Sequence, residues 1–148
     1  MRTIPPISSV LLSLLPALTL AQAPDAAMPR TPAPEGAEVY FLSPENGAEV
    51  KSPFTVRFGL RGMGIAPAGV QFDKTGHHHL LIDVDELPPL TLPLPTTDQV
   101  RHFGLGQTET ELELPPGQHT LQLVLGDHLH IPHDPPVISE KITVTVIE

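Results

Sequence analysis

The distribution of proline is the feature of this sequence that most restricts its fold. Nineteen prolines and eleven glycines are spread along 148 residues. Proline removes a backbone donor, and its ring clashes with the preceding turn when it lies inside a helix. No segment after residue 23 carries a sustained 3.6-residue period of apolar side chains. A chain of this length has room for one domain, and we expect that domain to be all-β.

Short segments in which apolar and polar residues alternate are the positive signal for strands. Such alternation is typical of strands with one buried face. Turn signals such as Asn46-Gly47 and Pro115-Pro116-Gly117 separate the segments. About seven strands at this spacing favour a single immunoglobulin-like antiparallel β-sandwich over residues 38–148. The expected strands cover residues 39–42, 54–58, 76–84, 99–103, 108–114, 119–125 and 137–146.

The N-terminal residues have the pattern of an export signal. Arg2 precedes a short apolar stretch at residues 10–20, which is too brief to span a bilayer. Ala21-Gln22-Ala23 presents small residues where a signal peptidase cleaves, so we predict a signal peptide at residues 1–23. Residues 24–37 are rich in proline and are predicted to be a disordered linker. The mature protein is then expected to be periplasmic or secreted, with no membrane insertion.

Charge and cysteine content exclude several kinds of function. The formal net charge is −9 and the chain has no cysteine. An acidic surface disfavours nucleic acid and anionic lipid as partners. Without cysteine the chain can form neither a disulfide nor a thiolate ligand, so the blue-copper type of site is excluded.

Histidine is concentrated in one part of the chain. All eight histidines lie between residues 77 and 133. His77 and His79 share the face of their predicted strand that is opposite to Leu80 and Ile82, because side chains alternate along a strand. In an immunoglobulin-like sandwich three of the connections meet at one end. That end would collect all the histidines except His119, which begins a strand at the opposite end.

Such a gathering predicts a metal site. Neutral imidazole is the commonest protein metal ligand, and it suits zinc and copper. Nearby carboxylates can ligate a metal or orient a histidine ring, and a thioether favours Cu(I). We therefore expect a metal-binding protein, with copper favoured over zinc. The candidate ligands are His77, His79, His102, His128, His130, His133, Asp127, Asp134 and Met63.

Other interpretations of the same residues stay open. His78 faces the expected core and His119 starts a core strand, so both suit structural roles, and Met63 suits loop packing. The chain can instead be an interaction module that binds a protein or an envelope polymer without metal. A metal-dependent enzyme with an aspartate base is the third reading. No Gly-x-Ser-x-Gly or His-Glu-x-x-His motif and no glycine-rich phosphate loop is present to support catalysis.

Several motifs together resemble a bacterial family known as domain of unknown function 4399. The resemblance covers roughly residues 38–147. It implies a single domain in a secreted or periplasmic protein of Gram-negative bacteria, and it implies no particular activity or ligand residues. The most specific motifs are Gly76-His77-His78-His79, His102-Phe103-Gly104-Leu105-Gly106 and Ile131-Pro132-His133-Asp134-Pro135-Pro136.

Overall fold

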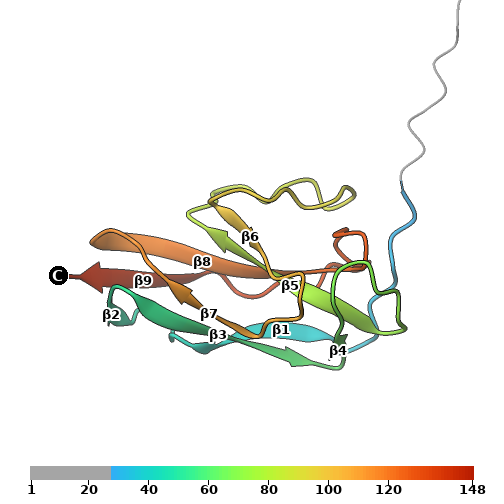
Figure 1. Cartoon of the computed structure of the whole chain (residues 1–148), viewed down its shortest axis with the longest axis horizontal. Coiled ribbons are helices and arrows are strands. Elements are labelled where there is room, and N and C mark those ends of the chain that lie inside the picture. The colour runs from blue at the N-terminus through green and yellow to red at the C-terminus, as the bar shows by residue number, and fades with distance from the viewer. Residues whose placement is uncertain (1–27) are drawn as a thin grey trace, which may run out of the picture.

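The computed structural model describes residues 28–148, and this part of the chain is all-β (Figure 1). It contains nine strands in two sheets and no helix. The all-β expectation is therefore confirmed for the described residues. The predicted signal peptide at residues 1–23 lies outside them.

The smaller sheet has three antiparallel strands in the order β1-β3-β7. Its strands are β1 (Glu38–Ser43), β3 (Phe54–Arg61) and β7 (Glu109–Leu112). In β3 the side chains of Phe54, Val56 and Phe58 are buried, whereas Thr55 and Arg57 are exposed. This is the alternation that the sequence predicts for a strand with one buried face.

The larger sheet has the order β2-β9-β8-β5-β4, and β6 also pairs with β5. Its central strands are antiparallel, but β2 runs parallel to β9 and β4 runs parallel to β5. The sheet is therefore mixed, and these two pairs differ from the wholly antiparallel arrangement that we expected. The strands are β2 (Glu49–Lys51), β4 (Gly64–Ile65), β5 (Thr75–Ile82), β6 (Val100–His102), β8 (Gly117–Gly126) and β9 (Ile142–Ile147).

Both faces of β5 are buried, which determines where the site forms. One face packs into the main core between the two sheets, where Leu80 and Ile82 lie. On the other face Leu81 packs with Leu94, Val100 and Val124 in a second apolar cluster. In this second cluster Leu94, from the segment before β6, packs on the side chains that β5, β6 and β8 present on the outer face of the sheet. As a result, polar side chains on that face of β5 are removed from water.

Within the segment that we expected to be a disordered linker, residues 31–33 pair with the domain, and residues 24–27 lie outside the described residues. Pro32 forms a parallel bridge with Asp134. The amide of Ala33 donates to the Asp134 carbonyl at 2.9 Å, and the amide of Asp134 donates to the Thr31 carbonyl at 2.9 Å. Non-proline residues between the prolines keep the donors and acceptors that this pairing needs.

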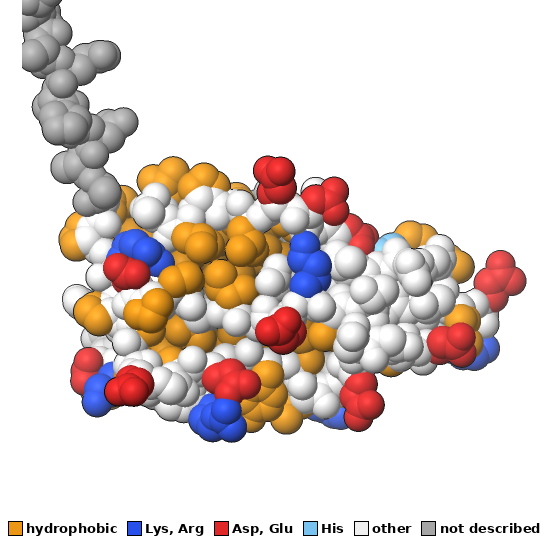
Figure 2. All heavy atoms as spheres, turned by 180° about the vertical axis from the view of Figure 1, so that it is seen from behind, with side chains coloured by type: hydrophobic (Ala, Val, Ile, Leu, Met, Phe, Trp, Pro, Cys, Tyr) orange, Lys and Arg blue, Asp and Glu red, His pale blue; other side chains and the backbone are white. Residues whose placement is uncertain are grey.

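Hydrophobic side chains gather on the face of the molecule that Figure 2 shows, and charged side chains lie around them. Among residues 28–148, no helix is long and apolar enough to cross a bilayer.

Candidate metal centre

Strand pairing brings three histidines to one face of the larger sheet. His77 and His79 are two residues apart on β5, so their side chains lie on the same face. β6 runs antiparallel to β5 with His102 directly opposite His79. Cross-strand partners in such a pair carry side chains on the same face at close range. The fourth histidine, His130, lies in the loop that follows β8.

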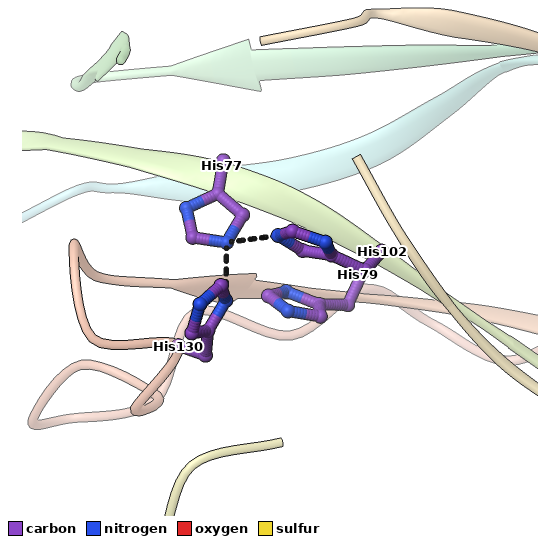
Figure 3. A group of neighbouring side chains, drawn as sticks. All are labelled: His77, His79, His102 and His130. Atoms are coloured by element: carbon purple, nitrogen blue, oxygen red, sulfur yellow. Dashed lines mark hydrogen bonds between the residues drawn. The ribbon is translucent and has the colours of Figure 1, made fainter. Parts of the chain in front are cut away.

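The four rings point toward one another (Figure 3). One ring nitrogen of each residue lies within 4.8 Å of the corresponding nitrogens of the other three. His77 Nε2 is 3.1 Å from His130 Nδ1 and 3.2 Å from His102 Nε2. We call His77, His79, His102 and His130 the four-histidine cluster. These four residues could hold a metal ion.

The separations can be compared with those in a mononuclear metal site. A tetrahedral site with metal–nitrogen bonds of about 2.0–2.1 Å places its nitrogens about 3.3–3.4 Å apart. The separations of His77 Nε2 from His130 Nδ1 and from His102 Nε2, 3.1 and 3.2 Å, are close to this value. The widest separation, 4.8 Å, exceeds it. Binding of an ion by all four residues would therefore draw at least one ring inward.

His79 supplies an independent indication that a ligand belongs in the cluster. Its side chain has 0% exposure, and neither ring nitrogen has a hydrogen-bond partner. A buried polar group left without a partner costs about 1–3 kcal/mol. Coordination to a cation would satisfy the ring at the nitrogen that faces the other three histidines.

Burial keeps the imidazoles of His77 and His79 neutral. Burial lowers the pKa of His79 to about 3 and that of His77 to about 4, and the neighbouring histidines add to both effects. Burial and the nearby His130 also lower the pKa of His102. The neutral ring is the form that binds metal ions, so these residues are ready to ligate at neutral pH.

Two glycines leave the space that the cluster rings occupy. A Cβ atom on Gly126 would lie 2.7 Å from His79 Cε1, and a Cβ atom on Gly104 would overlap the ring of His102. Gly126 ends β8 and Gly104 follows β6, so both lie at strand ends beside the cluster. Any larger side chain at either position would displace a ligand. Sequence reasoning missed this role, although Gly104 lies in one of the motifs quoted above.

His128 and His133 lie outside the four-histidine cluster, although the sequence placed them among its candidate ligands. The chain turns between Asp127 and His130, whose amide donates to the Asp127 carbonyl at 2.9 Å. His128 and His130 therefore do not share a face as they would in an extended segment. His133 is fully buried, with its ring nitrogens 3.2 Å from the Thr75 carbonyl and 3.4 Å from the Leu125 carbonyl.

The carboxylate and thioether candidates also lie outside the cluster. Asp127 is buried and accepts hydrogen bonds from Thr31 and from the amides of Leu129 and Ile131. Burial opposes its ionisation, but these hydrogen bonds outweigh it and lower the pKa of Asp127. Asp134 pairs with Arg30 at 3.3 Å. Met63 packs against the main core. All four ligands that the structure brings together are thus imidazoles.

The remaining two histidines occupy the positions that the sequence suggested. His78 faces the main core, with its ring 5.0 Å from that of Phe58. His119 lies near the other end of β8, where Nδ1 is 2.7 Å from Asp83 Oδ2 and Nε2 is 2.8 Å from the Pro115 carbonyl. Burial opposes the charged ring, but these partners outweigh it and raise the pKa of His119.

Comparison with known proteins places the chain in a family. No curated protein matches it. A solved structure of the endo-beta-1,4-mannanase from Thermotoga petrophila is similar at 18% identity and a TM-score of 0.45, over 76% of this chain and 20% of that one. The chain thus spans about a fifth of that enzyme's length. Residues 56–147 match the family described as a domain of unknown function (DUF4399), and the chain belongs to that family.

Proposed function

We propose that this protein binds a single metal ion through the four-histidine cluster, with copper preferred over zinc. The observation that supports the proposal is the convergence of four ring nitrogens within 4.8 Å. The partnerless ring of His79 adds to it, because an ion would supply the missing interaction. The lowered pKa values of His77 and His79 keep their lone pairs available at neutral pH.

The preference for copper follows from the chemistry of the ligand set. Imidazole nitrogen suits both copper and zinc, and the affinity of a given nitrogen site generally follows an order in which Cu²⁺ exceeds Zn²⁺. The chain has no cysteine, so no thiolate competes for either ion. Met63 packs against the main core and does not contribute to the preference.

We also propose that the protein acts in the periplasm or outside the cell. The proposal is supported by the sequence of residues 1–23, where a short apolar stretch is followed by Ala21-Gln22-Ala23. Detection of the mature N-terminus by mass spectrometry after expression with the full leader would test it. A protein that retains residue 1 would contradict the proposal.

Titration of tag-free residues 24–148 with Cu(II), Cu(I) and Zn(II) tests the metal site. We expect one ion per chain, with sub-micromolar Kd values and tighter binding of Cu(II) than of Zn(II). Affinity would be measured by competition with chelators of known strength. Micromolar or weaker binding of all three ions would overturn the proposal.

Two histidines of one loop provide a matched pair of variants. His130→Gln removes a cluster ligand, whereas His128→Gln changes a ring that lies outside the cluster. We expect H130Q to lose at least tenfold in affinity and H128Q to bind as the unaltered protein does. If H130Q binds as tightly as H128Q, the ion is not held by the four-histidine cluster.

A further inference from the structure

The loop that carries His130 is fastened to the N-terminal segment of the domain. We call residues 127–133 the ligand loop. The Arg30 side chain donates to the carbonyl of Pro132 at 3.1 Å and also to that of His133. The hydroxyl of Thr31 donates to Asp127 Oδ2 at 2.7 Å. These contacts join segments that are about a hundred residues apart in the sequence.

Asp127 connects the contact with Thr31 to the backbone on both sides of His130 through hydrogen bonds. Its Oδ1 accepts the amide of Leu129 at 2.9 Å and the amide of Ile131 at 3.0 Å. Its main-chain carbonyl accepts the amide of His130 at 2.9 Å. The Asp127 side chain is almost fully buried, so water does not compete for these bonds. One residue therefore holds the backbone immediately before and after a metal ligand.

His130 needs such support because of its backbone conformation. Its φ is 66°, in the left-handed region that residues other than glycine seldom adopt. A residue stays in this region only where its surroundings hold it there. The Leu94 amide adds a hydrogen bond to the His130 carbonyl at 2.9 Å. This conformation directs the imidazole toward His77 on β5.

We propose that Thr31, acting through Asp127, is a positioning residue for metal binding that fixes His130 without touching the ion. The proposal rests on the proposed function. The other three ligands are held by paired strands, so the ligand loop is the part of the site that requires separate ordering. A loop that is not ordered in advance must become ordered when the ion binds, and the free energy of that ordering weakens the affinity. Loss of partners that orient metal ligands typically weakens binding about 10–100-fold.

The test compares three variants with the unaltered residues 24–148. Thr31→Val keeps the shape of the side chain but removes the hydroxyl, and Thr31→Ser restores it. Ser139→Ala is the control, because the Ser139 hydroxyl is also largely buried and bonds the β8 backbone at Leu123, away from the cluster. We expect Cu(II) and Zn(II) affinity to fall about tenfold or more in T31V. T31S and S139A should bind within about twofold of the original protein.

A second measurement separates positioning from general stability. The electron paramagnetic resonance spectrum of the Cu(II) form should change in T31V, because the position of one nitrogen ligand changes, and it should not change in S139A. Thermal unfolding without metal would show how far each variant is destabilised. If T31V does not fold, Asp127→Asn replaces it, since the amide oxygen still accepts from Leu129 and Ile131.

The outcomes distinguish the two proposals. Tight binding by the original protein with an unchanged affinity and spectrum in T31V, or in D127N where that variant is used, overturns the positioning role alone. An equal loss in S139A also overturns it, because the effect is then one of stability. An original protein that binds no ion overturns the proposed function itself.

Discussion

His78 and His79 are neighbours in the sequence, but their rings lie in opposite surroundings. Both are buried and neither has a hydrogen-bond partner. The ring of His79 belongs to the four-histidine cluster, where an ion would satisfy it. The ring of His78 faces Phe58 in the main core, away from that cluster. Strand alternation places the two rings on opposite faces of β5, so only that of His79 lies where an ion could bind.

Replacement of His78 by leucine tests its buried position. Burial lowers the pKa of His78 from 6.5 to about 4, so the folded state keeps the ring neutral while the unfolded chain takes up a proton below pH 6.5. Stability is therefore lost as the pH falls from about 6.5 toward 4. Between pH 7 and pH 5 this loss amounts to roughly 2 kcal/mol. We expect H78L to be less sensitive to acid by about that amount, as measured by urea unfolding of the metal-free protein.

The metal affinity of H78L serves as its control. The ring of His78 lies outside the cluster, so binding at pH 7 should be unchanged. A variant that loses stability between pH 7 and pH 5 as steeply as the original protein would contradict the expected contribution of His78.

At the level of strands and loops, alternation predicted the longer elements well. Residues 54–58 and 119–125 alternate clearly, and they lie in β3 and β8. β2 and β4 have three and two residues, too few for a period to be detected, so they were not predicted. Their parallel pairing depends on contacts with β9 and β5 that local sequence does not encode.

The candidate site was predictable in part, where its residues lie on strands with a two-residue alternation. His77 and His79 follow from the two-residue period of a strand, and His102 follows once its short strand is paired with β5. The sequence treated His128 and His130 as an extended pair. The turn at Asp127 separates them, and it depends on bonds from Thr31 and from main-chain amides that no local pattern reveals.

A glycine at the end of β8 provides a test at this scale. In Gly126→Ala the added methyl group would lie 2.7 Å from His79 Cε1, so the ring must shift from its place in the cluster. Overpacking of this kind costs about 1–3 kcal/mol of stability. We expect metal affinity to fall as well, because the displaced ring belongs to the four-histidine cluster. Urea unfolding and chelator competition would measure the two effects.

Gly64→Ala is the matched control for that experiment. A Cβ atom on Gly64 would lie 3.4 Å from Thr75 Cγ2, an ordinary contact, and Gly64 has no positive φ. The control should keep both its stability and its metal affinity. Equal behaviour of G126A and G64A would show that His79 has room to move without cost.

For the molecule as a whole, the cluster joins segments that the chain separates widely. His77 and His130 are 53 residues apart in the sequence. The unfolded chain does not hold the four rings together, so an ion would bind the folded state almost exclusively. Without cysteine the chain has no disulfide to add to its stability, which makes such a contribution from an ion more significant.

Metal should therefore raise the stability of the folded protein in proportion to its affinity. A free ion concentration of one hundred times Kd adds about 2.7 kcal/mol to the free energy of unfolding. We expect urea unfolding at pH 7 to shift to higher denaturant concentration when Cu(II) is added, and H130Q to show little shift. An equal shift in H130Q would place the bound ion elsewhere on the protein.

The division of the ligands between strands and loop affects how quickly an ion would exchange. His77, His79 and His102 are fixed by hydrogen-bonded strands, whereas His130 is held by a loop. Local opening of a loop requires far less free energy than global unfolding. An ion bound here could dissociate when the loop that carries His130 opens, while the two sheets stay folded. The residence time of the ion would then depend on the loop, whereas the free energy of unfolding of the domain would depend on the sheets.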